Sequence, residues 1–225
     1  MLALEVALIC DRGGRRYNED ACGHWHSDRH LCCVLADGAG GHQRGAEAAR
    51  RAVDCIERLL RDDAVGYSPA NLSQMVRLAH SELVHHQDSV DPQARMHCTV
   101  VALWISPLAG HVLWTHVGDS RLYRIRHGRV DVVTVDDSVV QRMLQAGLIT
   151  PAQTHKHSQK NQLLAALGMD GDVEPHTVVR PVELLDGDAF LLCSDGWWDH
   201  FDHTALVAAL ERADSPERWL ADGPF

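Results

Sequence analysis

The sequence lacks three features that would place the protein in other classes. It has no basic excess, since 21 Lys and Arg stand against 31 Asp and Glu and the net charge is −10. This balance argues against a nucleic-acid duplex as partner. No apolar run approaches the ~18 residues that cross a bilayer, and the N-terminus lacks the basic region of a secretory signal. We therefore expect no membrane association and a cytoplasmic protein.

Cysteine-based motifs are missing as well. The seven cysteines are irregularly spaced and form no CxxC pair, which favours buried free thiols over a disulfide framework. Sixteen histidines are many, but no HExxH motif or paired CxxC accompanies them. A zinc-binding module is therefore kept only as an alternative.

Hydrophobic periodicity and turn residues outline one sizeable domain. The chain has 225 residues, of which 45% are hydrophobic and 23% charged, and no linker or internal repeat divides it. Apolar and β-branched runs predict strands at residues 5–10, 31–36, 99–105, 111–116, 121–126, 130–135, 178–181 and 189–193. Helical spacing predicts helices at residues 45–60, 71–85, 139–147, 163–167 and 204–213. Antiparallel strands with paired helices indicate an α+β layered domain.

Acidic residues recur where predicted strands meet glycines. Three apolar runs end at an aspartate beside a glycine, and a fourth acidic stretch, Glu19-Asp20, follows two arginines; the three pairs are Asp37-Gly38, Gly118-Asp119 and Asp195-Gly196. One Asp-Gly pair is more often a turn, so the prediction depends on the joint pattern. Carboxylates gathered from several strand ends repel one another unless a cation lies between them. Oxygen-only ligands suit Mg²⁺ or Mn²⁺ rather than zinc or copper.

Six segments in a fixed order carry a family signature. They are RRYNED at 15–20, ADGAGGHQRGAE at 36–47, MHCT at 96–99, HVGDSRLY at 116–123, HSQKN with ALG at 157–168, and LCSDG at 192–196. Together they resemble the motifs of the metal-dependent PP2C (PPM) serine/threonine protein phosphatases, in their compact bacterial form. The similarity spans nearly the whole chain and implies a single phosphatase domain over residues 1–225.

The resemblance implies an architecture and a set of metal ligands. The fold would be a sandwich of two antiparallel sheets flanked by helix pairs, with residues 139–172 as a flap subdomain over the cleft. Asp37 would bridge two Mn²⁺ or Mg²⁺ ions. Glu19 and the carbonyl of Gly38 would complete one site, and Asp195 would hold the other ion. Asp119 would share a third, weaker ion with Asp195.

The resemblance also implies a reaction and partners. Arg15 matches the arginine that binds the substrate phosphate, and a planar guanidinium suits two phosphate oxygens. Water activated between the two ions would hydrolyse phosphoserine or phosphothreonine in proteins without a covalent enzyme intermediate. The implied partners are a phosphorylated protein substrate and a cognate bacterial Ser/Thr kinase that the enzyme opposes. We expect a monomer.

The sequence departs from the family pattern in a few places. Asp136-Asp137-Ser138 stands where the family usually has Asp-His-Ser, and Asp20 is expected to be structural, accepting backbone N–H groups. The family normally has a C-terminal Asp-Asn pair followed by a strand, whereas this sequence ends at 221–225 with Asp222-Gly223. The sequence is thus either a fragment or natively short of that strand. The alternative to an active phosphatase is therefore a catalytically weak or inactive module that binds a kinase or phosphoprotein.

Overall fold

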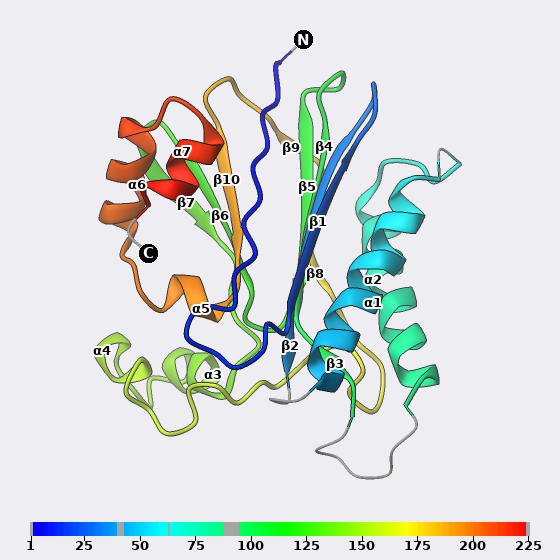
Figure 1. The fold of residues 1–225 in the computed structure, drawn as a ribbon, viewed down its shortest axis with the longest axis vertical. Coiled ribbons are helices and arrows are strands. Elements are labelled where there is room, and N and C mark those ends of the chain that lie inside the picture. Colours follow the sequence, from blue (N-terminus) through cyan, green and yellow to red (C-terminus); the bar gives the residue numbers. More distant parts are fainter. Residues whose placement is uncertain (1, 40–42, 63, 88–94, 224–225) are drawn as a thin grey trace.

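The computed structural model describes residues 2–39, 43–62, 64–87 and 95–223. In this part of the chain, a seven-stranded and a three-stranded antiparallel sheet face each other between helical layers (Figure 1). The larger sheet contains β1 (Asp20–His26), β2 (Leu31–Ala39), β3 (His97–Cys98), β4 (Val100–Ser106), β5 (His111–Val117), β8 (His176–Thr177) and β9 (Val182–Glu183). The smaller sheet contains β6 (Arg121–Arg126), β7 (Arg129–Val133) and β10 (Ala189–Cys193). The predicted α+β sandwich is therefore confirmed.

The central strand β4 explains how the layers hold together. Every residue of its sequence VVALWIS is buried, because helices cover one face of the larger sheet and the smaller sheet covers the other. Alternate residues point to opposite faces of a strand. Val100, Ala102 and Trp104 accordingly join the core under the helices. Val101, Leu103 and Ile105 join the core between the sheets.

Two long helices cover the outer face of the larger sheet. They are α1 (Gln43–Leu60) and α2 (Pro69–His85). The helix α2 begins as its sequence predicts, because the Ser68 side chain accepts a hydrogen bond from the Asn71 N–H and Pro69 follows at the first helical position. Ile56 of α1 is fully buried. No helix in the described ranges combines the length and apolar character needed to cross a membrane.

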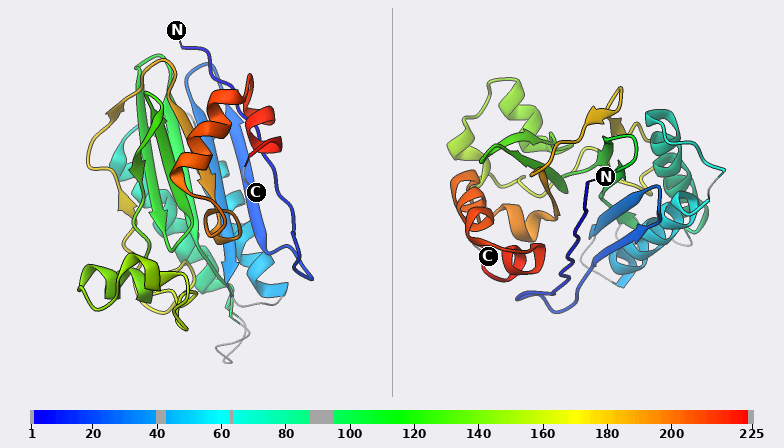
Figure 2. Two further views of the ribbon diagram at one scale, coloured as in Figure 1. Left: turned by 90° about the vertical axis from the view of Figure 1, so that its left-hand side faces the viewer. Right: turned by 90° about the horizontal axis from the view of Figure 1, so that it is seen from above.

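Shorter helices cover the smaller sheet and one end of the sandwich. They are α3 (Val139–Gln145), α4 (Pro151–Thr154), α5 (Asp195–Trp198), α6 (His203–Arg212) and α7 (Pro216–Ala221). Leu206 and Trp219 anchor α6 and α7 against Tyr123 of β6. Figure 2 shows α6 and α7 on the opposite side of the molecule from α1 and α2. The layers thus follow the order helices, sheet, sheet, helices.

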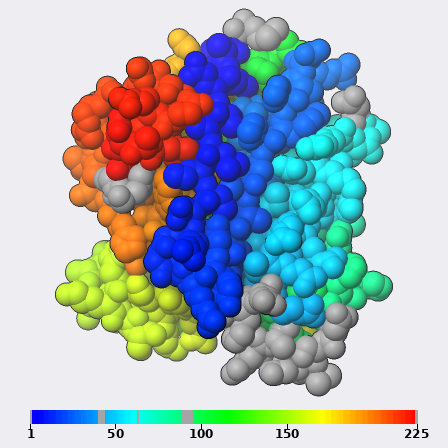
Figure 3. Space-filling view, viewed as in Figure 1, coloured from blue at the N-terminus to red at the C-terminus, as the bar shows by residue number. Residues whose placement is uncertain are grey.

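Some predicted elements differ from the structure. Residues 5–10 are not a strand; this segment runs over the face of the molecule shown in Figure 3, between β1 and the C-terminal helices. Together with parts of β1 and β10, it lines a cavity of about 480 Å³. Residues 163–167 are not a helix, because Leu163 and Leu167 form isolated β-bridges with Ser138 and Cys98. Residues 178–181 are not a strand; the short strands β8 and β9 lie just before and just after them. The strand β1 and the helix α7 were not predicted.

Replacing Ile56 with alanine should lower the free energy of unfolding by about 2–5 kcal/mol, because the change leaves a cavity between α1 and the larger sheet. Leu78→Ala on α2 is the control, since this leucine is 42% exposed; it should cost less than about 1 kcal/mol. Urea unfolding followed by circular dichroism measures both values. Equal losses would contradict the assigned core.

Candidate metal and phosphate site

Acidic side chains meet where strands of both sheets end. Asp37 lies near the end of β2, opposite Asp20 of β1 in the strand register. Glu19 immediately precedes β1, and Asp119 follows β5. Asp195 follows β10 from the smaller sheet and begins α5. The sandwich therefore gathers carboxylates from segments that are far apart in sequence, and we call Asp20, Asp37, Asp119 and Asp195 the acidic cluster.

The members of the acidic cluster are close enough to perturb one another. Burial first, and then the carboxylates of Asp20, Asp195 and Asp119, raise the pKa of Asp37 to about 9. Burial and the charge of Asp195, with a further contribution from Asp136, raise the pKa of Asp119 to about 7. Buried like charges are unfavourable without a compensating cation. The negative potential of the acidic cluster therefore favours the binding of cations.

Backbone contacts hold Asp37 in place despite this repulsion. The N–H of Asp37 donates to Thr99 Oγ1 at 3.0 Å, and the Thr99 N–H donates to the Asp37 carbonyl at 2.8 Å. The hydroxyls of Thr99 and Ser120 share a hydrogen bond of 2.6 Å. Both threonine and serine are buried. These hydrogen bonds fix the backbone of Asp37 and link β2, through Thr99, to the turn after β5.

Glu19 and Gly38 lie against the first turn of α1. The Gly38 N–H donates to the Glu19 carbonyl at 3.1 Å. A Cβ on Gly38 would lie 2.3 Å from the backbone carbon of Gly45, so only glycine allows this approach. A Cβ on Gly45 would lie 3.2 Å from Glu19 Oε1. The Glu19 carboxylate is therefore fixed beside the helix start, next to the strand end that carries Asp37.

Arg15 places the positive charge at the mouth of the site. One terminal nitrogen of its guanidinium lies 3.3 Å from Asp195 Oδ1, and its side chain is 57% exposed. A guanidinium in this position can hold a phosphate while it contacts the acidic cluster.

Asp20 is more closely involved than the sequence suggested. Its Oδ2 accepts a hydrogen bond of 2.9 Å from the Ser194 hydroxyl. Burial raises the pKa of Asp20, the hydrogen bond from Ser194 lowers it, and the charge of Asp195 raises it further. The doubled carboxylate Glu19-Asp20 is the sequence signal that pointed to this residue.

The donor set fits hard divalent cations. Carboxylate oxygens and a backbone carbonyl are the ligands that Mn²⁺ and Mg²⁺ prefer. In the described ranges, no three of these carboxylates have ligand atoms all within 4.8 Å of one another. Two ions about 3.5–4 Å apart spread their ligands more widely than one ion does.

The flap segment, residues 139–172, is tied to the helix that begins at Asp195. Asp199 of that helix end accepts hydrogen bonds from His155 Nδ1 at 2.9 Å and from Lys160 Nζ at 2.8 Å. These contacts hold both flap residues against the end of α5. Whether the segment moves as a flap stays a prediction.

A family model described as "Protein phosphatase 2C" matches residues 13–218. The chain belongs to the protein phosphatase 2C family. This match covers the acidic cluster, Arg15 and the flap segment, so the family predicted from the sequence motifs is confirmed.

Curated relatives agree with this membership. The serine/threonine protein phosphatase PstP of Mycobacterium tuberculosis is 34% identical over 224 residues, or 97% of this chain. The chain spans 42% of the length of that relative. The serine/threonine phosphatase stp of Listeria monocytogenes is 32% identical over 207 residues, covering 89% of this chain and 81% of the relative.

Solved structures of bacterial serine/threonine phosphatases share the fold. A serine/threonine phosphatase of S. agalactiae superposes with a TM-score of 0.86 at 25% identity, covering 96% of this chain and 89% of the other. The catalytic domain of PstP in complex with two manganese ions has a TM-score of 0.76 at 30% identity, covering 95% and 90%. The metal roles assigned to individual residues of this chain stay predictions.

In metal-free protein, we expect Asp37→Asn to raise the free energy of unfolding, with a gain that grows as the pH rises. The folded pKa of Asp37 is about 9, whereas an unfolded chain has about 3.9. Between these values the folded state binds more protons, so wild-type stability falls with rising pH, and the neutral amide avoids that loss.

Urea unfolding with a chelator at about pH 5 and about pH 8 measures this difference. Asp28→Asn, at an exposed position, is the matched control and should show no growing gain. A gain for Asp37→Asn that is equal at both pH values would contradict the raised pKa.

Proposed function

We propose that this chain hydrolyses phosphoserine and phosphothreonine in proteins, using two Mn²⁺ or Mg²⁺ ions and a third, weaker one. The observation that carries the proposal is the acidic cluster, in which Asp37 and Asp119 are buried, with the exposed guanidinium of Arg15 at its edge. A negatively charged phosphate reaches such a site only when cations offset the carboxylates. Family membership supplies independent support.

Each ligand has a proposed role. Asp37 would bridge the two ions, since the carboxylates of Asp20, Asp119 and Asp195 are all close enough to raise its pKa. Glu19 and the Gly38 carbonyl would complete the site beside α1. Asp195 would hold the other ion, and Asp119 would share the weaker ion with it. When bound, such ions acidify a water molecule and offset charge on the phosphoryl oxygens.

The protein's own residues bind and orient the phosphate rather than attack it. Arg15 would hold two phosphate oxygens with its planar fork, oriented by its contact with Asp195. The hydroxyls of Ser194 and Ser120 are engaged with Asp20 and Thr99. Burial raises the pKa of the Cys193 thiol, which makes it a poor nucleophile. These features support direct attack by water.

The proposed partners follow from the relatives. Proteins named serine/threonine phosphatase act on phosphorylated proteins, which supports a phosphoprotein substrate and an opposing Ser/Thr kinase for this chain. We also propose that the domain acts as a cytoplasmic monomer. A binding-only module is not favoured, because the similar proteins are named phosphatases.

Purified protein should release phosphate from a phosphothreonine peptide in Mn²⁺ and lose this activity in chelator. Asp37→Asn should lower kcat/KM by roughly 100-fold or more, because it weakens the charge stabilisation on which the reaction depends. Asp28→Asn is the control and should match the wild type. Equal turnover by wild type and Asp37→Asn would end the proposal.

Two adjacent arginines test the phosphate-binding role. At saturating Mn²⁺, Arg15→Ala should raise KM for the phosphopeptide about tenfold, because a charge-assisted hydrogen bond pair is lost. The guanidinium of Arg16 instead lies 5.3 Å from the centre of the Tyr17 ring. Arg16→Ala should therefore leave KM within about twofold of the wild type. Equal increases in the two variants would show a general charge effect rather than a phosphate clamp.

A further inference from the structure

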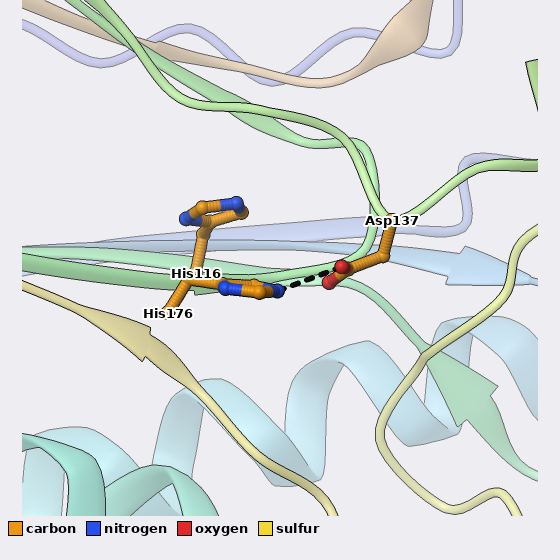
Figure 4. Close-up of side chains that lie close together, drawn as sticks. All are labelled: His116, Asp137 and His176. Carbon is orange, nitrogen blue, oxygen red and sulfur yellow. Dashed lines mark hydrogen bonds and ion pairs between the residues drawn. The ribbon is translucent and has the colours of Figure 1, made fainter. Parts of the chain in front are cut away.

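Two histidines and an aspartate gather behind the acidic cluster. His116 of β5 and His176 of β8 are register partners, and Asp137 follows β7 (Figure 4). Their candidate ligand atoms all lie within 4.8 Å of one another. His116 is 5% exposed. Because the proposed catalytic site does not use these side chains, the group calls for another explanation.

The contacts of this group favour a structural role over a metal site. The two imidazole rings are stacked, with centroids 5.0 Å apart and planes 27° apart. His116 Nε2 already bonds to the Val135 carbonyl at 2.8 Å. Figure 4 shows the His176 ring directed at Asp137 and the His116 ring above it. The hydrogen bonds of Asp137 point to a different role.

Asp137 holds both polar groups of Gly118. Its Oδ2 accepts a hydrogen bond from the Gly118 N–H at 3.0 Å, and its own N–H donates to the Gly118 carbonyl at 2.9 Å. Its other carboxylate oxygen lies 2.7 Å from His176 Nε2. The histidine therefore fixes the rotation of the carboxylate that binds the glycine.

The Gly118 backbone needs these two hydrogen bonds more than the backbone of another residue would. Its φ is +95°, and a Cβ would lie 2.7 Å from Thr99 Cγ2, so a larger residue does not fit. Glycine has the widest conformational freedom of all residues. Gly118 directly precedes Asp119, whose carbonyl accepts a hydrogen bond of 2.9 Å from Trp198 Nε1. Asp137 thus secures the chain before Asp119, as Trp198 does after it.

We propose that Asp137, oriented by His176, is a positioning residue that holds Asp119 in place and thereby sets the affinity of the ion that Asp119 binds. Like-charge repulsion within the acidic cluster pushes the Asp119 carboxylate away from the site. The clamp on Gly118 opposes that displacement. The inference rests on the proposed function, because it assumes that Asp119 is a metal ligand.

Mn²⁺ binding, followed as loss of the free-ion electron paramagnetic resonance signal, tests the proposal without turnover. Asp137→Ala should weaken the weakest site about 10- to 100-fold, as expected when a residue that orients a metal ligand is lost. Asp137→Asn should stay within about threefold of the wild type, because the amide oxygen still accepts from the Gly118 N–H. His176→Ala should give an intermediate loss.

Asp131→Ala is the matched control, since Asp131 is a partly buried aspartate paired with Arg124 away from the site; its titration should match the wild type. Phosphatase assays should show kcat for Asp137→Ala returning to within about threefold of the wild type at saturating Mn²⁺. Circular dichroism checks folding, and His176→Ala, at a half-exposed side chain, keeps the test valid if Asp137→Ala does not fold.

The outcomes separate the two proposals. Wild type that neither binds Mn²⁺ nor hydrolyses phosphopeptide overturns the proposed function and this inference with it. Active, Mn²⁺-binding wild type with an unchanged titration for Asp137→Ala, or for His176→Ala where the former is unfolded, overturns the inference alone. Asp137→Asn as weak as Asp137→Ala would also overturn it, because the effect would then come from the lost charge and not from the Gly118 contact.

Discussion

Mutual repulsion among buried and half-buried carboxylates is the constraint around which this structure is organised. Asp37 lies among the carboxylates of Asp20, Asp119 and Asp195, and burial adds to the cost of charging it. A chain could avoid this cost by exposing or removing these residues. Keeping them together makes sense for a protein that binds hard cations at this point.

The fold resists the repulsion with contacts that do not depend on a bound ion. Hydrogen bonds between Thr99 and the backbone of Asp37 hold the Asp37 carboxylate in place. Arg15 contacts Asp195, and the hydroxyl of Ser194 binds Asp20. These partners come from both sheets and from the N-terminal segment. A site preorganised in this way loses little free energy to rearrangement when a ligand arrives.

Local sequence patterns succeeded where packing on one face decides the structure. The strand at 121–126 and the two long helices follow from alternation and from 3.6-residue spacing. The patterns failed where distant partners decide it. Residues 163–167 have an apolar composition compatible with a helix, but bridges to Ser138 and Cys98 hold them extended. Residues 5–10 read as a strand, but no neighbouring strand in the described ranges pairs with them.

The sequence by itself determined the family and pointed to the acidic residues, because ordered motifs beside glycines are visible without coordinates. Tertiary structure alone decided which side chains support them. The role of Asp20 beside Asp37 depends on strand register. Asp137 binds Gly118, which lies 19 positions earlier in the sequence, and His176 binds Asp137 from 39 positions further along. Such contacts arise from sheet pairing and loop packing, and no local pattern encodes them.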